Sequence, residues 1–95
     1  MFDINNIGDE GQVKLSGRLD ASQAEYAQKT LRDVSGTVTA DCTELDYVSS
    51  AGITVILELH KRVTGSGHEL RLVGMNPRVR TVFVYTGLDT VLKIV

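Results

Sequence analysis

The sequence predicts an α/β fold in which a mixed sheet of four to five strands packs against three helices. Short segments that alternate apolar and polar residues, as strands do, take turns with segments whose apolar residues recur at helical spacing. Glycine, asparagine or proline marks most of the boundaries between these segments. The 95 residues include one proline and no internal repeat or low-complexity stretch, so we expect one domain over residues 1–95.

Two short strands joined by a turn are predicted at the start of the chain. Residues 2–7 suit one strand. Val13 and Leu15 alternate with polar neighbours, which is typical of a second strand with one buried face. The intervening residues 8–11 are acidic and rich in glycine, as turns often are. We expect the two strands to pair as a hairpin.

A helix and a third strand are predicted next. Ser22 and Glu25 have the spacing of a capping box, in which two side chains bond backbone amides at a helix start. Apolar residues then recur at helical spacing up to Gly36, which is predicted to end the helix. Residues 37–42 alternate in the manner of a strand rich in β-branched side chains. The acidic run 44–46 favours a turn and is predicted to form a loop.

A long apolar helix is predicted from residue 51 to the glycine-rich stop at residues 65–67. One apolar face packs inward, and Ile53 and Leu57 add a second apolar stripe. These two side chains either pack beneath neighbouring elements or form a contact patch for a partner. The sequence favours neither alternative.

The chain is predicted to end with a strand, a helix and a further strand. Leu70 and Leu72 indicate the strand, and Asn76-Pro77 is a favourable helix start because asparagine caps well and proline suits the first helical position. Gly87 is placed to end that helix, and residues 90–95 return to a strand pattern. The predicted order is β-β-α-β-α-β-α-β.

The composition and charge exclude several classes of function. A formal charge of −2 gives no field that would attract nucleic acid, so we expect no direct nucleic-acid binding. No apolar run approaches the roughly 20 residues that a membrane span needs, so we expect no membrane insertion. The start of the chain lacks the basic and apolar blocks of a signal peptide, and Cys42 is the only cysteine. We therefore expect a cytoplasmic protein.

The histidines and serines do not form a catalytic or metal-binding arrangement. His60 lies on the same predicted helix as Ser50, roughly 15 Å away at the helical rise per residue, so it cannot act as its base. The nucleophile motif G-x-S-x-G is absent. One cysteine and two histidines match no common metal-ligand spacing. The expectation is a protein that is not an enzyme and needs no metal or cofactor.

Two neighbouring serines at the start of the long helix invite two explanations. Either hydroxyl of Ser49 and Ser50 could cap the helix by accepting a hydrogen bond from a free amide. A phosphate on a serine at the same place would meet free amides and the positive end of the helix dipole. Such a charge would change a binding surface more readily than it would unfold the domain.

Three motifs, in the right order and spacing, resemble the STAS domain, the module of bacterial anti-sigma factor antagonists. The signature loop corresponds to residues 45–53, LDYVSSAGI. The family's strand ending in L-x-G-x-[LI]-D corresponds to residues 15–20, LSGRLD. Its last helix and the following turn correspond to residues 76–80, NPRVR, and residues 86–88, TGL. Together these motifs cover nearly the whole chain.

The resemblance implies a phosphorylation site and a partner switch. The family's phosphorylated serine lies two residues before the glycine, which is Ser50 here, and Ser49 is an alternative acceptor that stands where the family has an aspartate. The unphosphorylated domain is expected, as a monomer, to dock onto an anti-sigma factor that is itself a serine protein kinase. Phosphorylation by that kinase ends the docking, and a PP2C-type phosphatase restores it.

The expected docking surface combines the signature loop, the exposed side of the helix that follows it, and the turn at residues 17–22. Its predicted partner-binding residues are Asp20, Asp46, Ser49, Ser50, Ala51, Gly52, Ile53 and Leu57. Two other functions remain open. The domain could be an unphosphorylated STAS adaptor subunit of a transporter or sensory complex, or a small-ligand domain with an anion site at the serine helix. The last ranks lowest, because no phosphate-binding glycine loop or partnering lysine is present.

Overall fold

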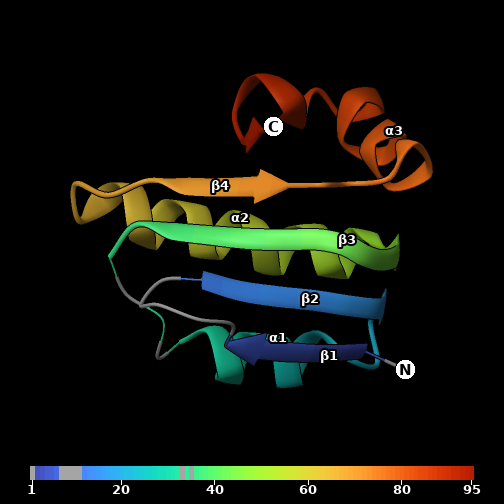
Figure 1. Cartoon of the computed structure of the whole chain (residues 1–95), viewed down its shortest axis with the longest axis horizontal. Coiled ribbons are helices and arrows are strands. Elements are labelled where there is room, and N and C mark those ends of the chain that lie inside the picture. Colours follow the sequence, from blue (N-terminus) through green and yellow to red (C-terminus); the bar gives the residue numbers. More distant parts are fainter. Residues whose placement is uncertain (1, 7–11, 33, 35) are drawn as a thin grey trace.

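A five-stranded mixed sheet organises the chain, and the computed structural model describes residues 2–6, 12–32, 34 and 36–95 (Figure 1). The elements are, in order, β1 (Phe2–Asn6), β2 (Gln12–Leu19), α1 (Ala24–Leu31), β3 (Val38–Val48), α2 (Ser50–Gly65), β4 (Leu70–Val73), α3 (Pro77–Tyr85), the 3₁₀ helix η1 (Leu88–Thr90) and β5 (Lys93–Ile94). This order confirms the predicted succession of strands and helices and the mixed sheet with three α-helices.

The strands lie in the sheet in the order β1-β2-β3-β4-β5. β1 pairs with β2 in antiparallel fashion, as the predicted hairpin requires, and each later pair is parallel. Figure 1 shows α1 and α2 behind the sheet, whereas α3 lies beside β4 at the end where the parallel strands finish. Both α2 and α3 therefore begin at the carboxyl edge of the parallel strands, where open α/β sheets commonly bind their ligands.

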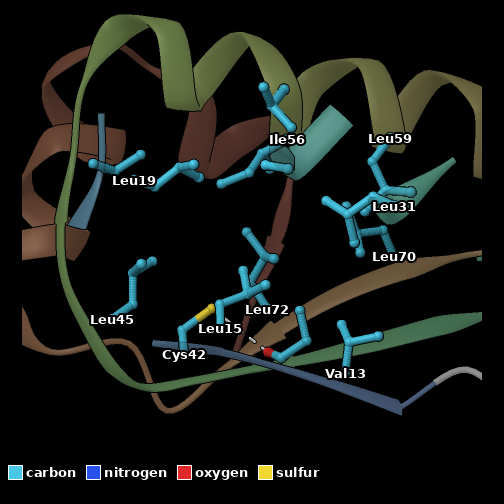
Figure 2. Close-up of a cluster of buried hydrophobic side chains, with 14 of the residues drawn as sticks. Val13, Leu15, Leu19, Leu31, Cys42, Leu45, Ile56, Leu59, Leu70 and Leu72 are labelled. Atoms are coloured by element: carbon cyan, nitrogen blue, oxygen red, sulfur yellow. Dashed lines mark hydrogen bonds between the residues drawn. The ribbon is translucent and has the colours of Figure 1, made fainter. Parts of the chain in front are cut away.

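The hydrophobic core lies between the sheet and its helices (Figure 2). Its largest fully buried side chains are Phe83, Leu19, Leu45, Ile56, Leu70, Leu72, Val13, Val38, Val79 and Cys42. Cys42 is wholly buried and packs in the core as a small apolar residue. The polar side chains of the strands face the other way, where charged groups such as Lys14 and Glu44 pair.

The third strand is longer than predicted, because the acidic run expected to form a loop belongs to β3. Between the pairs Gln12–Thr39 and Leu19–Val48, β3 uses more residues than β2, because the register of the two strands shifts twice. Each shift places an additional residue in β3, a β-bulge. Buried positions are consequently Ala40 and Cys42 and then Leu45, which breaks the alternation that a sequence pattern relies on.

Several boundaries also differ from the predictions. α1 begins after Gln23 with no side-chain cap, because Ser22 donates its hydrogen bonds to Asp20 instead of capping the helix. The predicted turn at residues 8–11 lies outside the described residues, as do Ile7 and its strand assignment. The last strand is confined to Lys93–Ile94, since η1 occupies the preceding residues up to Thr90.

The predicted start of α3 is confirmed in detail. The Asn76 side chain accepts a hydrogen bond from the Val79 amide at 2.9 Å, and Pro77 occupies the first helical position. The same side chain donates to the Leu45 carbonyl, also at 2.9 Å. One asparagine therefore caps α3 and fastens it to β3.

Gly52 allows α2 to begin against the end of β2. A Cβ atom at this position would lie 2.6 Å from the Leu19 carbonyl oxygen and 2.9 Å from Cγ2 of Val48. The nearest obstacle, the Leu19 carbonyl, is backbone, which cannot rotate away as a side-chain tip can, and Cγ of the buried Leu19 side chain lies only 2.7 Å away. Glycine is therefore needed at position 52 because there is no room for a Cβ atom, and not because the backbone there has an unusual conformation.

We expect Gly52→Ala to destabilise the protein by about 1–3 kcal/mol, the usual cost of inserting a methyl group into a packed site. This outcome opposes helix propensity, which favours alanine over glycine by about 1 kcal/mol in a helix interior. Gly65→Ala is the matched control, because it lies at the other end of α2 and a Cβ there meets nothing within 4 Å. Urea unfolding of both variants measures the difference, and equal effects would contradict the close-approach explanation.

We expect the Cys42 thiol to resist alkylation in the folded protein. Burial raises the pKa of Cys42 from 9.0 to about 12, so its reactive thiolate is scarce at pH 8. Iodoacetamide labelling followed by mass spectrometry should show slow modification of native protein and rapid modification in urea. Because the folded pKa is raised, the contribution of this thiol to stability is complete below pH 9 and declines as the pH rises towards 12.

Candidate functional site

The motifs expected to form the site meet at the carboxyl edge of β2 and β3. The Ser49 amide donates to the Leu19 carbonyl at 2.9 Å, which ties the end of β2 to the start of α2. Gly52 packs on the same residue of β2. The turn at Asp20 and the serine pair are therefore neighbours, although they are far apart in the sequence.

Ser49 is the N-cap of α2. Its backbone is extended, with φ −94° and ψ 176°, and its hydroxyl oxygen accepts a hydrogen bond from the Gly52 amide at 3.3 Å. Its carbonyl accepts the first bond of the helix, from the Ile53 amide at 2.9 Å. The capping role considered for either serine thus belongs to Ser49, whose side chain is partly buried.

Ser50 is the first residue of α2, and it is exposed. Within the described part of the chain its hydroxyl makes no hydrogen bond, and only its carbonyl is engaged, by the Thr54 hydroxyl at 3.1 Å. The amides of Ser50 and Ala51 have no partner within the helix because they belong to its first turn. Ser50 therefore offers an accessible hydroxyl beside free amides.

Asp20 organises the turn that follows β2. Its carboxylate accepts hydrogen bonds from the Ser22 hydroxyl at 2.6 Å and from the Ser22 amide at 3.1 Å. These bonds, led by that from the hydroxyl, hold the pKa of Asp20 below its usual value. Asp20 is therefore a carboxylate at neutral pH, and it stabilises a turn beside Ser49.

The predicted contact residues on α2 divide into two groups. Ile53 is 8% exposed and Gly52 is buried, so for Ile53 the packing alternative describes the structure and little of its surface is left for a partner. Leu57 and Ala51 are only partly buried, and Leu57 packs at the margin of the core. Of the α2 residues named in the predicted docking surface, Ser50 is the most open.

A cleft beside the signature loop was not predicted from the sequence. Asp46 and Tyr47 of β3, Arg18 of β2 and Arg78 of α3 line it, and its volume is about 200 Å³. The Arg18 guanidinium lies 4.2 Å from the centroid of the Tyr47 ring, a cation–π contact. Nothing in the sequence pattern indicates this contact, because it depends on the shifted register that places Arg18 opposite Tyr47.

The two histidines are distant in sequence from the serine pair, and among the described residues they do not cluster with other potential metal ligands. Nδ1 of His60 is buried and has no hydrogen-bond partner in the described part of the chain, whereas His68 is exposed. Among the described residues no group of three histidine, cysteine, aspartate or glutamate side chains could hold a metal ion. In the same part of the chain, no helix has the length and apolar character needed to cross a membrane.

Comparison with known proteins gives related sequences and folds. A Bordetella bronchiseptica protein named "Putative anti-sigma factor antagonist BtrV" is 37% identical over 77 residues, which cover 81% of this chain and 63% of BtrV. The chain thus spans less than two thirds of that relative. An anti-sigma factor antagonist from Mycobacterium paratuberculosis has a similar structure, with TM-score 0.86 and 17% identity, over 99% of this chain and 85% of its own.

The anti-sigma factor antagonist SpoIIAA shares the fold in two chemical states. Its unphosphorylated form has TM-score 0.72 at 16% identity, covering 100% of this chain and 87% of SpoIIAA. The phosphorylated Bacillus form has TM-score 0.71 at 18% identity, covering 100% and 91%. A family model described as "Mlab, STAS domain" matches residues 2–95. The chain belongs to the STAS domain family, as its three motifs indicate.

Proposed function

We propose that this chain is an anti-sigma factor antagonist in a phosphorylation-controlled partner switch. With Ser50 unphosphorylated, it docks onto an anti-sigma factor that is also a serine protein kinase. Phosphorylation of Ser50 ends the docking, and a PP2C-type phosphatase restores it. The chain itself contributes a surface and an acceptor hydroxyl, and it catalyses no step.

The observation that carries this proposal is that the two neighbouring serines have different environments. Ser49 caps α2 and is partly buried, so its hydroxyl is engaged in the structure. Ser50 has an exposed hydroxyl with no hydrogen bond among the described residues, so a kinase can reach it without disturbing the helix. This difference favours Ser50 over Ser49 as the acceptor.

Local electrostatics explain how the switch could act without unfolding. A phosphate on Ser50 adds about −1.5 to −2 charges at the positive end of a 16-residue helix, where the fold tolerates them. In a docked complex the same charge must lose its water. The related fold of SpoIIAA is known in both states, with TM-scores to this chain of 0.72 and 0.71, which supports such tolerance.

A second candidate keeps the docking surface and removes the switch. Ser49 stands where the resemblance places an aspartate, and this departure at the signature loop favours an adaptor subunit of a transporter or sensory complex. In that case Ser50 is simply the first residue of α2. The two candidates differ in one observable property, the transfer of a phosphoryl group to Ser50.

We expect incubation with ATP and a kinase of the anti-sigma type to add one phosphoryl group, and Ser50→Ala to abolish the gain. Ser49→Ala should retain it while losing about 1 kcal/mol of stability with the N-cap. Intact-mass measurement and phosphosite mapping distinguish these results. A kinase that binds tightly and transfers no phosphoryl group would favour the adaptor.

We expect Ser50→Asp to weaken kinase binding by roughly ten- to a hundredfold, which corresponds to about 1.4–2.8 kcal/mol. Ser66→Asp is the matched control, because it places the same charge just beyond the other end of α2, on an exposed residue. Calorimetric titration measures both affinities. If the two variants bind equally well, the position of the charge does not control docking.

A further inference from the structure

We propose that the cleft between Tyr47 and the first turn of α3 binds a carboxylate side chain of the docked protein partner, held by Arg18 and Arg78. This inference rests on the proposed function, because it names a contact within the same docking edge. The cleft is lined by Arg18, Asp46, Tyr47, Val48, Arg78, Val79 and Val82. Val48 lines the cleft and immediately precedes the serine pair, so the cleft and Ser50 lie at the same end of β3.

The charges of the cleft favour an acidic occupant. Among the ion pairs of the described residues, neither Arg18 nor Arg78 takes part, and both side chains are exposed. Two guanidinium groups and the single carboxylate of Asp46 leave a net positive lining. A carboxylate can accept two parallel hydrogen bonds from a guanidinium, and such charge-assisted bonds are roughly twice as strong as neutral ones.

Arg18 is already held in position for such a contact. Its guanidinium lies over the Tyr47 ring, 4.2 Å from the ring centroid, and Tyr47 as a residue is 39% exposed. This cation–π contact restrains the guanidinium beside the ring, and its N–H groups make no hydrogen bond or ion pair among the described residues. An arginine ordered before binding loses less side-chain entropy when the carboxylate arrives.

Arg78 occupies a place that helix stability alone does not favour. It lies in the first turn of α3, which contains no acidic residue. A cation there opposes the positive end of the helix dipole, so the position costs a little stability unless an anion approaches. A partner carboxylate in the cleft would offset this unfavourable interaction. Residues that break a local rule of stability are expected at binding sites, and Arg78 is such a residue.

The test uses a blocked oligoglutamate peptide as the probe and the matching oligoglutamine peptide as its control. Titration of the isotope-labelled chain should shift the backbone NMR signals of Arg18, Tyr47 and Arg78 with the glutamate peptide only. The shifts should shrink in Arg18→Gln and Arg78→Gln and as salt is added. Arg80→Gln, an exposed arginine of the same helix outside the cleft, should behave as wild type.

Absence of these shifts, or equal shifts with both peptides, would overturn the proposal. With an anti-sigma kinase in place of the peptide, Arg18→Gln and Arg78→Gln should each weaken binding about tenfold. If Ser50→Asp weakens that complex and the arginine variants do not, the cleft proposal fails and the switch stands. If the arginine variants weaken it and Ser50→Asp does not, the switch fails and the cleft stands.

Discussion

The close approach between the start of α2 and the end of β2 is the constraint on which the site depends. Gly52 gives the Leu19 carbonyl the room it needs, and that carbonyl accepts the Ser49 amide. Ser49 in turn uses its hydroxyl to hold the Gly52 amide. These contacts set the depth of the helix start against the sheet, and Ser50, whose hydroxyl takes part in none of them, is exposed.

Local signals predicted the elements whose boundaries are set by local chemistry. Asn76 and Pro77 determine the start of α3 through a cap and a fixed backbone angle, and both act within a few residues. The predicted third strand was too short, because the bulges of β3 are set by its pairing with β2 and no local sequence pattern indicates them. Ser22 illustrates the same limit, since its hydroxyl could either accept a hydrogen bond from a helix amide or donate one to Asp20, and in the structure it donates to Asp20.

The candidate site was predictable as a set of motif positions and not as a surface. The motifs identified Asp20, Ser49 and Ser50, and the structure brings them to one edge. They did not indicate that Ser49 takes the cap and leaves Ser50 free. The cleft around Arg18 and Tyr47 was also missed, because its walls come from three elements that meet only in the folded chain. Surface exposure likewise distinguishes Leu57 from Ile53, which share one sequence pattern.

The bulges of β3 affect how positions are transferred between relatives. Within this strand a gap in an alignment can record a bulge gained or lost inside the sheet, and not a loop that has been shortened. Counting forward from Asp41 would then misplace the proposed acceptor serine by a residue. Counting back from Gly52 avoids the error, because the glycine is fixed by its contact with Leu19. The glycine is therefore the safer reference point for identifying the corresponding hydroxyl in distant STAS domains.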